Sequence, residues 1–139
     1  MKFIWQKKYS VGLQSLDEQH KHFFEITNKL HDLLKNYSGA QEKELEIIFD
    51  ELLNYALYHL AEEEEFFLKC KYEETEVHCK MHETYREKMR DYRQKIRECS
   101  KSEKIKLAKE AQKYAVNWLS EHILKVDQRY TSTLKKCLG

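Results

Sequence analysis

The chain has 139 residues, of which 41% are hydrophobic, 12% aromatic and 35% charged, and it contains three Gly, no Pro, four Cys and seven His. This length suits one folded domain, and the scarcity of Gly and Pro excludes a turn-rich β sandwich or barrel, a collagen-like chain and most disordered chains. The 25 basic and 24 acidic residues leave a net charge of +1, which gives no overall attraction to nucleic acid or to an anionic membrane. We therefore expect long helices joined by short loops, and we expect neither nucleic acid nor a membrane as a partner.

The start of the chain and its cysteines bear on the compartment. Residues 1–8 lack the apolar stretch of a secretory signal, and no apolar run approaches the roughly 18 residues of a membrane span. We expect a cytoplasmic protein whose cysteines are reduced thiols and, because no CxxC pair occurs, neither a zinc ribbon nor a thioredoxin-like motif. These cysteines are Cys70, Cys79, Cys99 and Cys137.

Residues 1–14 are predicted to form an arm that is anchored through Trp5 and Tyr9. A first helix is expected over about residues 16–37, where Ser15-Leu16-Asp17-Glu18 has the pattern of a capping box and Gly39 suits a left-handed residue after the helix. The inward positions alternate in steps of four and three, as in a bundle helix. They are Leu16, His20, Phe23, Thr27, Leu30 and Leu34.

Three further helices follow the same logic, over about residues 41–67, 75–99 and 103–126. The last begins at a second capping-box pattern, Ser100-Lys101-Ser102-Glu103. Four helices of roughly 20 residues with short loops predict an all-α, antiparallel up-down-up-down four-helix bundle, one domain over 1–139. The inward stripes of these three helices include His59, Glu63, His78, His82, Tyr85, Met89, Ala111, Ala115 and His122.

Histidines on these inward stripes are the most informative feature of the sequence. His59 and Glu63 project within about 40° of each other on one helix, as do His78 and His82 on the next, so each pair can bind a metal from one face. A single inward His is more often a hydrogen-bonded core residue, but five with an acid would bury five rings that each need a partner. The five are His20, His59, His78, His82 and His122.

Imidazole and carboxylate ligands together suit iron, zinc, copper or nickel rather than calcium or magnesium. Five His and an acid exceed the four ligands of one structural zinc, so two metals fit better. His22 and His31 are expected at the surface. Within the run Glu62-Glu63-Glu64-Glu65 only Glu63 lies on the stripe, and the other three are expected in solvent.

Four stretches of the sequence, taken in order, carry a resemblance to a known family. They are Trp5…Tyr9-Ser10-Val11-Gly12…Leu16-Asp17-x-Gln19-His20-Lys21, His59-x-x-x-Glu63, His78-x-x-x-His82 and Asn117-Trp118-Leu119-x-x-His122-x-x-x-x-Asp127-x-x-Tyr130. They resemble the bacterial hemerythrins (bacteriohemerythrin), a family of O2-binding non-haem di-iron proteins. The resemblance implies two iron ions bridged by a hydroxide or oxo group, Glu63 and Asp127. His78, His82 and His122 would hold one iron, and His20 and His59 the other, which leaves one position open for O2.

Helical spacing alone leaves the place of Asp127 open. It follows His122 by five residues, which is about 140° around an ideal helix, so the helix must widen or end near this point. A dry pocket for O2 would be lined by neighbours of the ligands, which can equally be ordinary bundle core. The candidates are Phe23, Phe24, Leu60, Trp118, Leu119 and Ile123.

The ferritin-like oxidases and oxygenases are the main competing class of di-iron bundle. They use Glu-x-x-His pairs, and no Glu stands three residues before any His in this chain. Five neutral imidazoles also favour reversible binding over O–O cleavage. We therefore expect a non-enzymatic protein that binds O2 for storage, delivery or sensing, with an unidentified protein partner left open. The alternatives are a di-iron enzyme that scavenges peroxide or nitric oxide, a ferroxidase, and a purely structural or zinc-loaded bundle.

Overall fold

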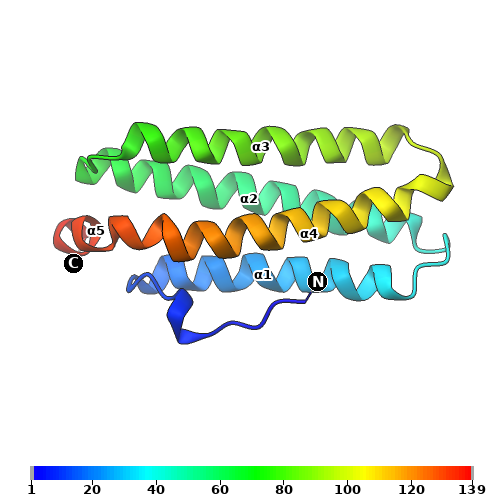
Figure 1. The fold of residues 1–139 in the computed structure, drawn as a ribbon, viewed down its shortest axis with the longest axis horizontal. Helices are drawn as coiled ribbons and strands as arrows, with labels where there is room; N and C mark the ends of the chain where they lie inside the picture. The colour runs from blue at the N-terminus through cyan, green and yellow to red at the C-terminus, as the bar shows by residue number, and fades with distance from the viewer. Residues whose placement is uncertain (1, 139) are drawn as a thin grey trace.

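The computed structural model describes residues 2–138, and their four long helices form an up-down-up-down bundle (Figure 1). Each helix packs against two neighbours in cyclic order, α1 on α2, α2 on α3, α3 on α4 and α4 on α1. No strand occurs within 2–138, so the predicted all-α bundle is confirmed. The helices are α1 (Gln14–Lys35), α2 (Glu42–Cys70), α3 (Thr75–Glu98) and α4 (Lys101–Lys125).

Neither predicted capping box forms. The residue that precedes α1 is Leu13, two residues before Ser15, where the pattern places the cap, and α1 ends at Lys35, before Gly39. Ser100 does precede α4, but its hydroxyl lies 3.1 Å from the hydroxyl of Ser102 and makes no hydrogen bond to a backbone amide of the first turn. The second pattern thus marks where α4 begins, although its side chains form no cap, whereas α1 begins two residues before the first pattern predicts.

The N-terminal arm runs beside α1 and contains a single 3-10 turn, η1 (Lys7–Tyr9) (Figure 1). Trp5 and Tyr9 pack against the core. Phe3 is an additional anchor, since its ring stacks on Phe24 and its backbone N–H and C=O both bond to the side chain of Asn28, at 2.8 and 2.9 Å. Phe24 therefore faces the arm.

The chain continues past α4 into a segment for which the sequence predicted no structure. A 3-10 turn, η2 (Asp127–Tyr130), leads into α5 (Thr131–Leu138), which packs on α2 and buries Leu134. A disulfide between Cys70 and Cys137 joins the end of α2 to α5. The expectation that all four cysteines are thiols is therefore wrong for this pair, because a 67-residue separation gives no sign that α5 folds back onto α2. Cys79 and Cys99 are free and half-buried.

No helix in the described chain combines the length and the apolar character that crossing a membrane requires.

We predict that the disulfide stabilises the fold by restricting the unfolded chain. Cys137→Ser is expected to lower the free energy of unfolding by about 2–4 kcal/mol, the usual contribution of a disulfide that closes a long loop. Urea denaturation without reductant measures this, and the native chain should lose a similar amount when reductant is added. Cys99→Ser is the matched control, because Cys99 is not part of the bridge. Equal stability of the native chain with and without reductant would contradict the prediction.

Candidate metal centre

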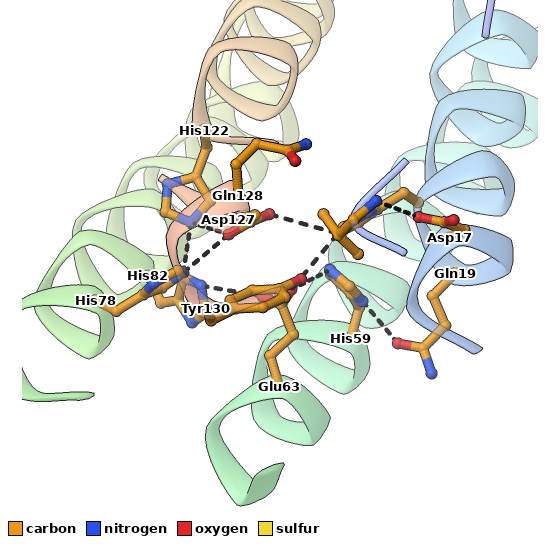
Figure 2. Close-up of polar contacts among 12 residues, drawn as sticks. Asp17, Gln19, His59, Glu63, His78, His82, His122, Asp127, Gln128 and Tyr130 are labelled. Carbon is orange, nitrogen blue, oxygen red and sulfur yellow. Dashed lines mark hydrogen bonds and ion pairs between the residues drawn. The ribbon is translucent and has the colours of Figure 1, made fainter. Parts of the chain in front are cut away.

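Seven predicted ligands meet inside one end of the bundle, and Figure 2 labels six of them, all except His20. Their exposed fractions lie between 0% and 5%, so all seven side chains are withdrawn from water. Each of the four long helices contributes, because residues four apart on a helix project from the same face. The candidate ligands are His20 on α1, His59 and Glu63 on α2, His78 and His82 on α3, His122 on α4, and Asp127 in η2.

One group of ligand atoms forms around Asp127. Its Oδ1 lies 2.9 Å from Nε2 of His78 and 3.0 Å from Nε2 of His122, and these two nitrogens are 2.9 Å apart. Ligands about 2.1 Å from a metal and at right angles to each other are separated by about 3 Å. The three atoms therefore have the spacing of neighbouring ligands on one ion. His82 completes this group.

A second group comprises His20, His59 and Glu63. Oε2 of Glu63 lies 3.5 Å from Nε2 of His20 and 3.7 Å from Nε2 of His59. All the ligand atoms of the group lie within 4.8 Å of one another. This second group contains two imidazoles, one fewer than the first.

Each carboxylate faces both groups. The other oxygen of Glu63, Oε1, lies 3.3 Å from Nε2 of His82 in the first group. The other oxygen of Asp127, Oδ2, lies 3.5 Å from Nε2 of His20 in the second. Two carboxylates that each span two sets of imidazoles are arranged as bridging ligands of a metal pair.

Several inward atoms make no hydrogen bond within the described chain. These include Nε2 of His20, His59 and His82, and Oε1 of Glu63. A buried polar atom without a partner destabilises the fold by about 1–3 kcal/mol, so a cluster of such atoms without bound ions would be strongly destabilising. Bound cations would satisfy all of these atoms together, and imidazole with carboxylate is a donor set that iron accepts.

Comparison with known proteins identifies the family. Residues 11–134 match the family described as Hemerythrin HHE cation binding domain. The chain belongs to the hemerythrin family. It is 32% identical to a bacteriohemerythrin of Clostridium acetobutylicum, over 92% of this chain and 98% of the relative, and 30% identical to a myohemerythrin of Theromyzon tessulatum, over 95% and 93%.

The fold agrees with this family assignment. A crystal structure of wild-type hemerythrin superposes with a TM-score of 0.84 at 26% identity, covering 95% of this chain and 97% of that one. Hemerythrins are O2-binding non-haem proteins with a di-iron centre, and the two ligand groups of this chain fit such a centre.

Two of the candidate ligands, His59 and His82, contact partner side chains that the sequence did not predict (Figure 2). Nδ1 of His59 lies 2.7 Å from Oε1 of Gln19, and Nδ1 of His82 lies 2.9 Å from Oε2 of Glu64. An Nδ1–H that donates outward leaves the Nε2 lone pair directed at the metal. Such contacts join residues on different helices, so the spacing of residues within one helix does not predict them.

Glu64 corrects an expectation from the sequence. It was grouped with Glu62 and Glu65 as a solvated residue, but its side chain is only 21% exposed. Beyond its contact with His82, it accepts a hydrogen bond of 2.8 Å from Nη2 of Arg86. Glu64 lies about 100° around α2 from Glu63, and that direction faces α3 rather than solvent.

The end of α4 explains how Asp127 reaches the site. The helix stops at Lys125, and the tighter turn of η2 directs Asp127 inward, which settles the question that helical spacing left open. Three residues later, the hydroxyl of Tyr130 donates a hydrogen bond of 2.7 Å to Oε2 of Glu63. The η2 turn therefore supplies one carboxylate and holds the other.

The Tyr9-Ser10-Val11-Gly12 motif and Asp17 hold this turn in place. Asp17 accepts hydrogen bonds from the Ser10 hydroxyl, at 2.5 Å, and from the Val11 N–H, at 2.8 Å. The backbone carbonyls of Ser10 and Val11 in turn accept from Gln128 at 3.1 Å and from Thr131 at 2.9 Å. The arm, the start of α1 and the C-terminal segment thus form one hydrogen-bonded unit beside the centre.

The predicted pocket residues do not all lie together. Phe23, Leu60, Leu119 and Ile123 are buried in the core, and the ring of Phe23 is 6.3 Å from that of His59. Half-buried Trp118 stacks on His122 with ring centroids 4.3 Å apart. Phe24 stacks on the arm instead. His22 is exposed and His31 half-buried, and neither is among the clustered ligands.

Burial and charge act in opposite directions on the imidazoles. Burial lowers the pKa of His59 to about 3 and keeps its ring neutral. Burial also opposes protonation of His82, but the carboxylates of Glu63 and Glu64 outweigh it and raise the pKa of His82 to about 9. Burial disfavours the charged form of Glu63 as well, yet the neighbouring imidazoles hold the pKa of its carboxyl well below the usual range.

We predict that metal loading at neutral pH releases a proton from His82. A pKa of about 9 means that metal-free His82 carries a proton below that pH, and a metal at Nε2 must displace it, so metal affinity should rise as the pH increases toward about 9. Calorimetry in two buffers with different ionisation enthalpies counts the released protons. Glu64→Gln removes one carboxylate that holds this proton and should release fewer. Identical heats in both buffers would refute the prediction.

Tyr130→Phe should weaken the centre without altering its ligand set. The substitution removes the hydrogen bond to Glu63, and loss of such an outer partner typically lowers metal affinity by about 10–100-fold. Competition with a chelator measures the affinity. Tyr72→Phe is the matched control, because the hydroxyl of Tyr72 donates to Glu74 and not to a ligand. Equal affinities for the two variants would show that Tyr130 does not support the site.

Proposed function

We propose that this chain binds O2 reversibly at two iron ions and serves in O2 storage, delivery or sensing. The observation that carries the proposal is that Glu63 and Asp127 each face both imidazole groups. Seven side chains can thus hold two ions that share bridges but differ in their number of imidazoles.

In this proposal, one ion is held by three imidazoles and the other by two, with Glu63, Asp127 and a hydroxide or oxo group as bridges. Counting ligands gives six for the first ion and five for the second, so one position on the second remains open for O2. When bound, the two iron ions would supply the electrons that reversible O2 binding requires. The first set is His78, His82 and His122, and the second is His20 and His59.

The surrounding side chains suit an open position for O2. Phe23, Leu60, Leu119 and Ile123 are almost wholly buried, and we propose that they keep water from the open position. The outer partners differ between the two ions. His82 contacts the carboxylate of Glu64, whereas His59 contacts the neutral amide of Gln19. A charged partner makes an imidazole a stronger donor, so the two ions would differ electronically as well as in coordination.

We also propose a cytoplasmic location for this chain. The Cys70–Cys137 disulfide is unusual for that compartment, so its state in cells bears directly on this part of the proposal.

Visible absorption of protein loaded anaerobically with ferrous iron tests O2 binding. An absorption band should appear with O2 and disappear on deoxygenation over repeated cycles. Irreversible bleaching with net consumption of peroxide would favour a scavenging enzyme instead. Fewer than two irons per chain after iron-replete anaerobic preparation would count against both functions.

His59→Ala is expected to abolish O2 cycling while the helices remain formed, because it removes one of only two imidazoles from the open ion. Helix content by circular dichroism and the absorption cycle are measured on the same samples. His22→Ala is the control, since His22 is exposed on α1 two residues from His20. Normal cycling by His59→Ala would refute the division of ligands.

A further inference from the structure

A row of aromatic rings runs along the seam between α3 and α4, beginning at a metal ligand. The ring of His122 stacks on Trp118 with centroids 4.3 Å and planes 12° apart, and Trp118 stacks on Tyr85 at 4.3 Å. Tyr85 stacks on Tyr114 at 5.9 Å, and Tyr114 lies 6.1 Å from Tyr92. We call Trp118, Tyr85, Tyr114 and Tyr92 the aromatic row.

The row alternates between the two helices. Trp118 and Tyr114 lie one turn apart on α4, and Tyr85 and Tyr92 lie two turns apart on α3, so each pair shares a face of its helix. Packing alone would explain apolar rings in this seam. It does not explain the hydroxyl of Tyr85, which is buried and has no hydrogen-bond partner within the described chain, since Phe would fill the same space without that cost.

We propose that the aromatic row is an electron-transfer path between the metal pair and the protein surface. It would carry electrons inward from a surface donor when hydrogen peroxide reacts at the centre. Trp and Tyr are among the side chains most readily oxidised by one electron, and rings in contact are strongly coupled electronically. The inference depends on the di-iron centre but not on reversible O2 binding.

The chemistry balances with two named reactants. Reduction of one hydrogen peroxide to two waters consumes two electrons and two protons. Each electron passes along the aromatic row and leaves a neutral tyrosyl radical at its outer end, with the phenolic proton released to water. A small enediol donor such as ascorbate then returns one electron and one proton to each radical. The iron ends in its starting oxidation state, and two donor molecules are each oxidised by one electron.

The four rings of the aromatic row differ in whether they can release a proton when they are oxidised. Trp118 can lose an electron without losing a proton. Tyr85 has no acceptor for its proton within the described chain, so its ring can transmit an electron but cannot hold a stable neutral radical. Tyr114 and Tyr92 are partly exposed and can release the proton to solvent.

Lys88 marks the outer end of the row. Its ammonium lies 5.1 Å from the ring centre of Tyr92 and 5.9 Å from that of Tyr114. A nearby positive charge disfavours a cationic ring, so the stable product at this end is the neutral radical. Burial and the carboxylates of Glu110 and Asp91 raise the pKa of the Tyr92 hydroxyl, so its proton leaves only with the electron.

Another aromatic route leaves the centre on the α1–α2 side and serves as a comparison. It passes from His59 through Phe23 to Tyr55, with ring separations of 6.3 and 6.2 Å. Phe resists one-electron oxidation, so this route is broken at its first step. Tyr55→Phe is therefore a matched control for the tyrosines of the aromatic row.

Electron paramagnetic resonance of iron-loaded protein frozen soon after mixing with hydrogen peroxide tests the proposal. The native chain should show a tyrosyl radical, and nitroso spin trapping with peptide mass spectrometry should place it on Tyr92 and Tyr114. Tyr92→Phe should move the label to Tyr114 and slow ascorbate oxidation several-fold. Trp118→Phe should remove the radical, and Tyr85→Phe should lower its yield several-fold, because Phe resists one-electron oxidation. Tyr55→Phe should match the native chain.

Several outcomes would overturn the proposal. These are no protein radical in the native chain, a label on Tyr130 or Tyr72 instead, or the same label and donor oxidation after Tyr92→Phe. Tyr92 is at the solvent end, so its variant keeps the test decisive if Trp118→Phe does not fold. O2 cycling is recorded separately on the native chain, so failure of O2 binding and failure of the electron path are distinguished.

Discussion

Two buried carboxylates shared between two groups of imidazoles are the constraint on which the rest of this structure depends. Transfer of an ionised carboxylate from water into a protein interior is costly unless opposite charge and hydrogen bonds compensate it. Glu63 and Asp127 are both almost fully buried and lie close together, so each also raises the cost of ionising the other. Imidazoles on every long helix surround them. Metal ions at the same place would neutralise the carboxylates and give the inward nitrogens a partner.

This constraint explains why the two ends of the chain meet beside the centre. A straight continuation of α4 would direct Asp127 away from the interior. The η2 turn redirects it, and the turn is held by hydrogen bonds from Gln128 and Thr131 to the arm, by Tyr130 on Glu63, and by the disulfide of α5 to α2. Asp17 joins the arm to the start of α1. The packing of the four helices places five imidazoles and the carboxylate of Glu63. The contacts that hold η2 place the second carboxylate, that of Asp127.

The surroundings of the two imidazole groups are unlike each other. The three-imidazole group borders the aromatic row and has a charged outer partner in Glu64, itself paired with Arg86. The two-imidazole group borders Phe23 and has a neutral outer partner in Gln19. In the proposed centre, one side would combine electron-rich rings with a path to solvent, and the other would combine an open coordination position with apolar walls. The same bundle can keep ligand binding and electron supply on separate faces.

The sequence by itself determined the helical bundle and most of the ligands. A residue and its neighbour four positions later share a face of any α-helix. His59 therefore lies on the same face as Glu63, and His78 on the same face as His82, however the helices pack. Only the tertiary structure decided which residues support those ligands. The contacts of Gln19 and Glu64, the place of Phe24 against the arm and the Cys70–Cys137 bridge all join separate elements. Such contacts depend on how each helix is rotated and where it ends, and neighbouring elements set both.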